Sequence, residues 1–406
     1  GRAEHERAPA AFDAAAARVR PGDLAALLYT SGTTGTPKAV MVTHRMALWI
    51  EASLRLVAGM DAGDRLVSYL PMAHIAERFM SVWQPSVRGA QSWLCPDPLH
   101  LGVALEAARP TWFFGVPRIW EKYRAALEPA LAHAGAAGAA APAARLLERA
   151  GLDRCRVAFT GGAPIDPAVL GFFRDLGLEV SEMWGMTEFG PGTWNGVTDV
   201  RIGTVGVPMP GAEVRLDADG ELLVRGGNVT PGYWRDPEGT AEAIDAQGWM
   251  HTGDVGTVDA DGYFRIVDRK KDIIITAGGK NVSPATLESL VKRHPLVGEV
   301  CVVGDRRPYP SALVVLDHAA VAAWAGARGI GTASPAALAD HPAVLDEVGR
   351  AVEAANRMVS RPEQIKRFTV LRTEWTVESQ EVSPTLKLRR RLIQARYAGE
   401  IEAMYR

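Results

Sequence analysis

Residues 29–40 read YTSGTTGTPKAV, the most informative stretch of the sequence. It joins two short apolar runs, 24–29 and 39–43, which predict strands on either side of a loop. Its glycines let the backbone turn and bring N–H groups close to an anion, while its hydroxyls and lysine add donors and a positive charge. This composition favours polyphosphate binding, although the Walker A pattern is absent and a flexible Ser/Thr/Gly hairpin is the plainer alternative. The candidate phosphate-binding residues are Thr30, Ser31, Gly32, Thr33, Thr34, Gly35 and Lys38.

Strand-like and helical segments alternate from this loop to about residue 176. The strand-like runs are 65–70, 112–116 and 156–160, and the helical segments are 44–59, 100–109, 118–150 and 166–176. Such alternation predicts an α/β layer with a parallel sheet. Residues 133–144 are of low complexity in Ala, Gly and Pro and predict a flexible insertion.

The pattern changes near Gly203, where short alternating strands lie between Gly, Asp and Pro turns. This change predicts a β-rich subdomain at about 200–271. Beyond the charged run 268–272, mixed strand-like and helical segments predict a compact α+β domain. The expected fold is therefore α/β, with a large N-terminal domain over 1–271 that includes the β-rich subdomain, and a small α+β domain over 272–406.

The composition is that of an ordinary globular protein, with 47% apolar and 23% charged residues among 406. A formal charge of -2 argues against a dominant surface for nucleic acid or anionic membranes. The cysteines, Cys95, Cys155 and Cys301, lie far apart without metal-ligand spacing, which fits lone buried thiols in a reducing compartment. No apolar run approaches the ~18–20 residues of a spanning helix, so we expect a cytoplasmic protein and leave peripheral membrane contact open.

Further strings that suit nucleotide chemistry follow the loop. Residues 184–188 read WGMTE, in which an aromatic face can stack on a base, Thr187 can bind a phosphate oxygen and Glu188 is a hard oxygen ligand for Mg²⁺. TGGAP at 160–164 follows a strand and lets a flat base approach the backbone. TGD at 252–254 and SPTLK at 383–387 come next. Each string alone has a plainer explanation, such as a turn on a buried Trp or a basic surface segment.

In this order, across residues 29–391, the strings resemble the adenylate-forming superfamily of acyl-CoA synthetases, luciferases and peptide-synthetase adenylation domains. The resemblance implies that Glu188 is the metal ligand and that the catalytic residues are Lys387, Thr187, Glu188 and His74. It implies ATP- or AMP-binding roles for the loop residues and for Gly162, Ala163, Trp184, Gly185, Met186, Thr187, Asp254 and Arg269. It also implies a hinge at Lys271, about which the small C-terminal domain moves, and coenzyme A binding at Gly278 and Gly279.

Three segments resemble the long-chain acyl-CoA synthetases: YLPMAHIAER at 69–78, TWFFGVPRIWEK at 111–122 and IIITAGGKNVSP at 273–284. This branch implies ATP-dependent activation of a long-chain fatty acid to acyl-AMP and transfer to coenzyme A. The expected partners are the fatty acid, ATP and coenzyme A, with Mg²⁺, no tightly bound organic cofactor and no nucleic acid. The branch places His74 near the acyl end of the pocket, and a capping or core histidine is the alternative.

The sequence also departs from the superfamily pattern. Trp184 stands where most members have Tyr, and residues 378–381 (ESQE) replace a usual Asn-Gly turn. Only 28 residues precede Tyr29, whereas members usually carry a substantial N-terminal segment, so we expect a fragment or a reduced homologue with a shortened N-terminal domain. Two alternatives to the synthetase follow: a ligase for another acceptor or for an aryl acid, and a truncated, inactive nucleotide-binding homologue.

Overall fold

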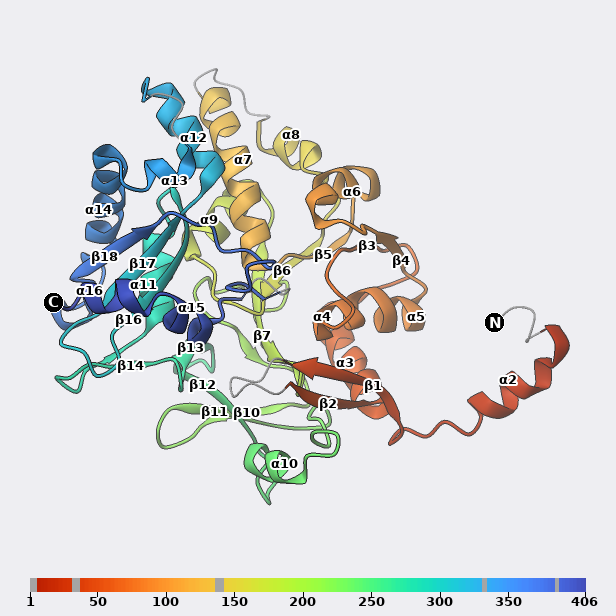
Figure 1. Ribbon diagram of the computed structural model, residues 1–406. Coiled ribbons are helices and arrows are strands. Elements are labelled where there is room, and N and C mark those ends of the chain that lie inside the picture. Colours follow the sequence, from red (N-terminus) through yellow and green to blue (C-terminus); the bar gives the residue numbers. More distant parts are fainter. Residues whose placement is uncertain (1–5, 31–36, 136–141, 331–333, 384–386) are drawn as a thin grey trace.

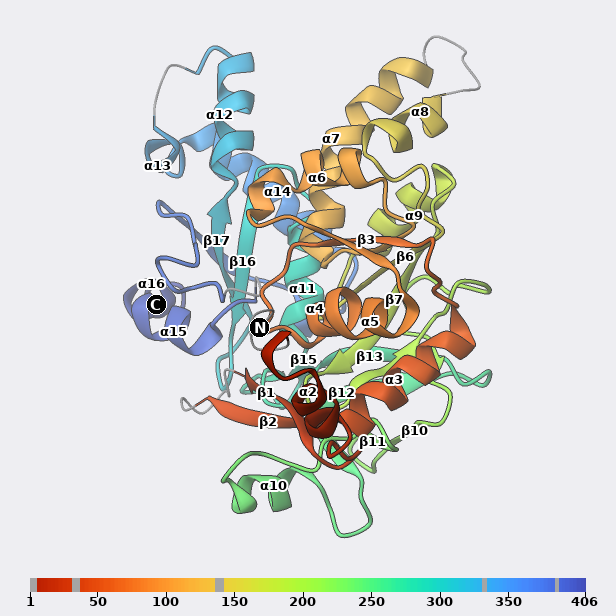
Figure 2. The ribbon, with the colours of Figure 1, turned by 90° about the vertical axis from the view of Figure 1, so that its right-hand side faces the viewer.

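The computed structural model describes residues 6–30, 37–135, 142–330, 334–383 and 387–406. Five of the candidate phosphate-binding residues, at 31–35, lie outside the described residues. Figure 1 shows the C-terminal part, in blue, packed on one side of the N-terminal part, and Figure 2 shows the same division after a quarter turn.

A five-stranded sheet forms the centre of the N-terminal part. Its order is β5-β6-β7-β8-β9, from Trp112–Phe114, Val157–Gly161, Val180–Met186, Gly190–Trp194 and Val207–Pro208. The strands β5, β6 and β7 are parallel, which confirms the predicted parallel sheet, and β8 and β9 add two antiparallel strands that the sequence did not predict. A further parallel pair joins β3 (Arg65–Ser68) to β4 (Gln91–Leu94).

The side chains of β5 explain why this sheet is buried on both faces. Phe113 packs into a cluster with Leu105, Trp120 and Phe173, whereas its neighbours Trp112 and Phe114 pack into a second cluster on the other face. Successive strand residues point to opposite faces, so a run of large apolar residues requires cover on both. The helices of this part are α2 (Pro9–Ala16), α3 (His44–Val57), α4 (Ile75–Arg78), the π-helical turn η1 (Phe79–Trp83), α5 (Gln84–Arg88), the 3₁₀ turn η2 (Pro98–His100), α6 (Leu101–Ala108), α7 (Pro117–Gly135), α8 (Pro142–Arg149) and α9 (Pro167–Asp175).

The predicted loop lies between two strands that form an antiparallel hairpin. β1 (Leu24–Thr30) pairs with β2 (Lys38–Thr43), so Thr30 and Lys38 stand opposite each other at the base of the loop. The β-rich subdomain is also confirmed. It is a four-stranded antiparallel sheet of β10 (Glu213–Leu216), β11 (Glu221–Arg225), β12 (Met250–Val258) and β13 (Phe264–Arg269), with α10 (Pro237–Ala243) inserted between β11 and β12.

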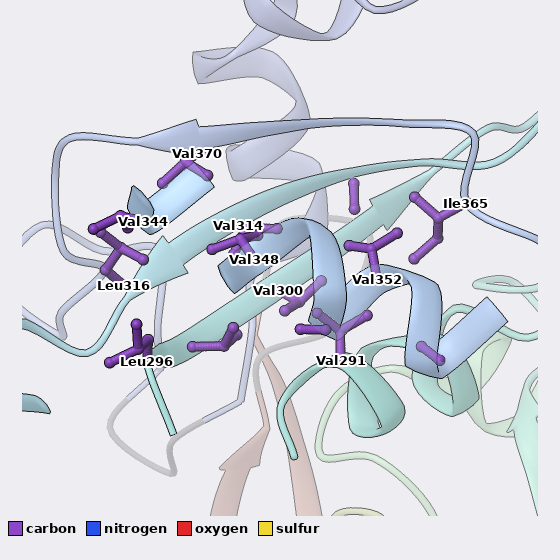
Figure 3. Close-up of a cluster of buried hydrophobic side chains, with 14 of the residues drawn as sticks. Val291, Leu296, Val300, Val314, Leu316, Val344, Val348, Val352, Ile365 and Val370 are labelled. Atoms are coloured by element: carbon purple, nitrogen blue, oxygen red, sulfur yellow. The ribbon is translucent and has the colours of Figure 1, made fainter. Parts of the chain in front are cut away.

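The C-terminal part is built on a three-stranded sheet with helices, in agreement with the predicted α+β fold. Its strands are β16 (Val297–Val303), β17 (Ser311–Leu316) and β18 (Arg367–Leu371). Val300 and Val314 face Val291 and Val348 of the helices in the cluster drawn in Figure 3. The opposite face, with Cys301 and Leu313, is covered by Ile393 and Met404. The remaining elements are β14 (Ile274–Ile275), β15 (Asn281–Val282), α11 (Pro284–Val291), α12 (His318–Ala327), α13 (Pro335–Leu338), α14 (Pro342–Asn356), η3 (Arg361–Glu363), α15 (Arg390–Arg396) and α16 (Ala398–Ala403).

The character of the helices and the state of the cysteines bear on where we expect the protein to lie in the cell. Within the described residues, none of the helices has both the length and the apolar character needed to cross a membrane. The cysteines are free thiols, with Cys95 and Cys301 buried and Cys155 partly buried. The expected cytoplasmic location stays a prediction.

Candidate active site

Asp254 and Arg269 are held together by the pairing of two strands. Asp254 of β12 lies directly opposite Arg269, the last residue of β13, and the Arg269 Nε lies 2.7 Å from Asp254 Oδ1. The second carboxylate oxygen accepts a hydrogen bond from the Trp184 indole at 2.7 Å. Asp254 is buried, whereas the Arg269 side chain keeps 37% of its surface exposed. Three predicted nucleotide-binding residues therefore meet at one point, with a guanidinium open to solvent.

Trp184 is an anchored side chain within this group. Only 6% of its surface is exposed, and its ring packs against Phe189 at 5.1 Å between centroids. A Cβ at Gly192 would lie 2.8 Å from the Trp184 ring, so glycine makes room for the large indole. The departure from Tyr thus supplies an indole N–H that fixes Asp254, a hydrogen bond that the sequence did not suggest. The stacking of this ring on adenine stays a prediction.

Glu188 is held by a residue that sequence reasoning missed. The Tyr233 hydroxyl donates to Glu188 Oε1 at 3.0 Å, and the Lys38 ammonium lies over the Tyr233 ring at 4.6 Å from its centroid. Burial and the nearby Glu188 carboxylate raise the pKa of Tyr233 well above its usual value. Tyr233 therefore remains a neutral donor that connects the predicted metal ligand to the base of the phosphate loop.

The backbone explains how Tyr233 reaches this position. The Met41 N–H donates to the Gly232 carbonyl at 3.0 Å, and the Trp234 N–H donates to the Ala39 carbonyl at 2.8 Å. The segment around Tyr233 thus pairs with the edge of β2. The only sequence signal was the string PGYW at 231–234, and nothing in it indicated this partner strand.

Lys387 reaches the same region from the C-terminal part. In Figure 1 the dark-blue segment before α15 extends toward β6 and β7. Lys387 keeps solvent-accessible surface, yet enough protein surrounds its ammonium that burial lowers its pKa. Arg269 and Lys271 lower that pKa further, whereas Asp254 and Glu188 act in the opposite direction. Lys387 therefore lies within electrostatic range of the predicted ribose and metal ligands.

His74 lies within electrostatic range of the Lys387 ammonium. Its Nδ1 accepts the Ala76 N–H at 3.2 Å and so caps α4, which shows that the capping interpretation was correct for this nitrogen. Burial, with a smaller contribution from Lys387, lowers the pKa of His74 to about 4. A Cβ at Gly162 would lie 4.0 Å from His74 Nε2, and Gly162 adopts φ +84°, a left-handed conformation that favours glycine. Gly162 thus lies close to His74, and Gly162 and Ala163 are both exposed.

Two hydrogen bonds join Lys387 to Ser383, four residues before it in the chain. Ser383 accepts the Lys387 N–H on its side chain at 3.0 Å and donates its own N–H to the Lys387 carbonyl at 2.8 Å. Three residues later, Arg390 makes two hydrogen bonds to the buried Glu288 of α11, at 2.6 and 2.5 Å. These bonds position the Lys387 backbone despite the absence of the Asn-Gly turn.

The remaining predicted residues are a glycine turn in the C-terminal part, the hinge residue and the end of β7. Gly278 and Gly279 form an exposed turn between β14 and β15, where the Gly279 N–H donates to the Thr276 carbonyl at 2.8 Å. The turn is tied to the C-terminal part by the hydrogen bond from the Ala277 N–H to the Arg307 carbonyl, also 2.8 Å long. Lys271 is the second residue after β13, and its neighbour Lys270 pairs with the buried Glu221 at 3.0 Å. Gly185, Met186 and Thr187 lie at the end of β7 next to Glu188.

The described residues contain no group of three or more His, Cys, Asp or Glu side chains that could hold a metal ion by themselves. Mg²⁺ usually takes one or two protein carboxylates and completes its shell with water and substrate phosphates. A single buried carboxylate, Glu188, close to the base of the phosphate loop therefore fits an ion that arrives with a nucleotide.

Comparison with protein families and curated proteins gives a consistent result. The family model described as AMP-binding enzyme matches residues 2–234, and the model described as AMP-binding enzyme C-terminal domain matches residues 271–406. The chain is 41% identical to the putative fatty-acid--CoA ligase fadD11 of Mycobacterium tuberculosis (strain ATCC 25618 / H37Rv), over 97% of this chain and 76% of that protein. It is 37% identical to the long-chain-fatty-acid--CoA ligase FadD15 of Mycobacterium bovis, over 98% of this chain and 72% of that protein.

Solved structures show the same fold. The A domain of a carboxylic acid reductase from Segniliparus rugosus, in complex with AMP and a co-purified carboxylic acid, superposes with a TM-score of 0.76 at 26% identity. The match covers 95% of this chain and 62% of that one, so the chain spans about three fifths of the adenylation domain.

Proposed function

Because this chain belongs to the AMP-binding enzyme family, we propose that it joins a long-chain fatty acid to coenzyme A by way of an acyl adenylate. The observation that carries the proposal is the placement of Lys387 from the C-terminal part within electrostatic range of Glu188, Asp254 and Arg269. The relatives at 41% and 37% identity carry the name of fatty-acid–CoA ligases, which supports the choice of substrate class.

In the first step a carboxylate oxygen of the fatty acid attacks the α-phosphorus of ATP. The bond from that phosphorus to the bridging oxygen breaks, and pyrophosphate leaves with the electron pair. Negative charge builds on the carboxylate and the α-phosphate, and the Lys387 ammonium is the group that stabilises it. Both reactants are held side by side, which removes much of the entropic barrier of a bimolecular step.

The nucleotide is held by residues of the N-terminal part. Asp254 and Arg269 meet the ribose hydroxyls, Trp184 and the backbone at Gly162 and Ala163 border the adenine, and Thr30 and Lys38 hold the phosphates from the base of their loop. Glu188, with Thr187 beside it, would hold Mg²⁺, which would neutralise phosphate charge. Tyr233 orients Glu188 through the 3.0 Å hydrogen bond.

In the second step the coenzyme A thiolate attacks the acyl carbonyl, the bond to the AMP oxygen breaks, and AMP leaves. The C-terminal part turns about Lys271 between the two steps, which withdraws Lys387 and brings Gly278 and Gly279 to the pantetheine arm. Exposure of that turn in the present arrangement is consistent with a role in another arrangement.

The decisive experiment measures pyrophosphate release with ATP, Mg²⁺ and a panel of fatty acids from short to very long, with and without coenzyme A. We expect fatty-acid-dependent release, and acyl-CoA when coenzyme A is present. Release without acyl-CoA would favour a different acceptor. No release from a chain that still binds ATP would overturn the proposed activity and favour the inactive nucleotide-binding homologue.

A further inference from the structure

Among the described residues, several polar contacts join the C-terminal part to the N-terminal part, and one of them lies far from the hinge in sequence. The carboxylate of Asp166 accepts two hydrogen bonds from the Arg293 guanidinium, with Nε 2.6 Å from Oδ2 and Nη2 2.8 Å from Oδ1. The two residues are 127 positions apart in the chain. Paired bonds of this kind fix the orientation of both groups as well as their distance.

Both residues stand at the ends of rigid elements. Asp166 caps α9, because its Oδ1 also accepts the Ala168 N–H at 3.0 Å, and only 7% of its surface is exposed. Arg293 follows the last turn of α11, the helix that packs beneath β16 of the C-terminal sheet. The ion pair therefore connects the N-terminal cap of α9 with the turn that follows α11.

The position of Asp166 connects the pair to the candidate active site. Asp166 comes directly after residues 162–165, the loop in which Gly162 approaches His74 Nε2. From the C-terminal part, Lys387 affects the pKa of the same His74. The loop that precedes Asp166 therefore approaches a histidine that lies within electrostatic range of Lys387.

The other polar side-chain contacts across the interface lie beside the hinge or are longer. Ser283 and the Ala285 N–H bond to Asp268 at 2.6 and 3.1 Å, and Asp268 lies only three residues before Lys271. Arg118 approaches Asp317 only to 3.9 Å and is shared with Glu121 at 3.5 Å.

We propose that Arg293 is a positioning residue for adenylate formation: through its ion pair with Asp166 it holds the C-terminal part where Lys387 reaches the site. This inference rests on the two-step reaction proposed above. The ion pair between Arg293 and Asp166 does not contribute to thioester formation, because Lys387 has to leave the site before that step. Its loss therefore slows the first step and leaves the second step intact.

The test measures the two steps separately in Arg293→Gln and Asp166→Asn, the latter keeping an oxygen for the Ala168 N–H. We expect fatty-acid-dependent ATP–pyrophosphate exchange to fall about fivefold, as for loss of a partly exposed ion pair. Thioester formation from supplied acyl-AMP and coenzyme A should stay within about twofold of the unsubstituted protein. The exchange rate of Arg293→Lys should lie between those of Arg293→Gln and the unsubstituted protein, because lysine keeps the charge but cannot form the two paired hydrogen bonds.

Arg174→Gln is the matched control. It removes an ion pair to Glu179 at the other end of α9, its side-chain exposure of 40% is close to the 43% of Arg293, and both partners lie in the N-terminal part. We expect both steps to be unchanged. An equal fall of both steps in Arg293→Gln, or no fall in either, would overturn the proposal.

A second measurement separates this inference from the proposed function. Dyes on Leu99→Cys and Met358→Cys, which are 88% and 66% exposed in the two parts, report their separation by energy transfer once Cys155→Ser removes the partly buried thiol. In Arg293→Gln the distribution of transfer efficiencies should differ from that of the protein that keeps Arg293, whether or not any fatty acid is activated. An unchanged distribution would contradict the positioning role, even in a protein that proved inactive.

Discussion

The C-terminal part carries two candidate functional elements, and they lie in different surroundings. Lys387 lies within electrostatic range of Glu188, Asp254, Arg269 and His74, all contributed by the N-terminal part. The turn of Gly278 and Gly279 is exposed, and its backbone bonds stay within the C-terminal part. This placement of the C-terminal part therefore presents a cation to the proposed nucleotide site and leaves the glycine turn exposed.

This difference separates the two proposed steps in space. Charge that develops at a phosphate is stabilised by a fixed cation, as Lys387 is placed to provide. Attack by a long, flexible thiol requires a backbone that the pantetheine arm can approach closely, and glycine allows this. Substitutions in the two elements should therefore affect different steps.

The largest effect is expected for Lys387→Ala. Loss of the ammonium should slow adenylate formation by about a hundredfold or more, while thioester formation from supplied acyl-AMP stays largely intact. Single-turnover assays of each step, started from ATP or from acyl-AMP, make this comparison. Lys366→Ala, which removes an exposed cation from the same part, is the control. Equal loss of both steps would remove Lys387 from its assigned role.

Asp254→Asn should affect both steps, because AMP occupies the site in each. The amide keeps an acceptor for the Trp184 indole but loses the ion pair with Arg269 and the charged acceptor for the ribose. We expect about a thirtyfold rise in the KM for ATP and a similar weakening of acyl-AMP binding, from the loss of charge-assisted hydrogen bonds. Glu213→Gln breaks the exposed pair with Arg225 in the same sheet and should leave both constants unchanged. A step-specific effect of Asp254→Asn would contradict a shared nucleotide site.

Gly279→Ala should affect the opposite reaction step from the one that Lys387→Ala affects. Gly279 has φ +75°, and a Cβ there would meet no atom within 4 Å, so the substitution strains the backbone without a clash. Thioester formation should fall by about tenfold and adenylate formation should not change. Gly329→Ala is a close control, with φ +65° and equally open space. The comparison between the two elements fails if Gly279→Ala slows pyrophosphate release instead.

Much of this architecture could be predicted from the sequence, for identifiable reasons. Apolar runs bounded by turn residues predict the strands β1, β2, β5 and β6. The change to mixed strand-like and helical segments after residues 268–272 predicts the separate C-terminal domain. The strands β8 and β9 were missed because Gly190–Trp194 contains two glycines and a proline, residues that argue against a strand when no partner is known.

The missed site residues share a different cause. Tyr233 contacts Glu188 from 45 positions away, and Arg293 contacts Asp166 from 127. Neither lies in a string of unusual composition, and a single Tyr or Arg carries no sign of its partner. Trp184 was recognised, but its bond to Asp254 depends on the packing of a ring that only the folded chain defines.

The smallest effect concerns His74, and it tests where Lys387 lies without any assay of activity. Burial and Lys387 hold the pKa of His74 at about 4, below the 6.5 of an ordinary histidine. A folded-state pKa below the unfolded value means that this contribution to stability is complete above pH 6.5 and is lost as the pH falls toward 4. Relative to His74→Asn, the free energy of unfolding should decrease by about 1 kcal/mol more between pH 6.5 and 5. In Lys387→Ala the pKa of His74, followed by NMR, should rise part of the way toward 6.5 because the burial remains. Gly279→Ala should leave it unchanged, and an equal response to both substitutions would show that Lys387 is no nearer to His74 than the glycine turn is.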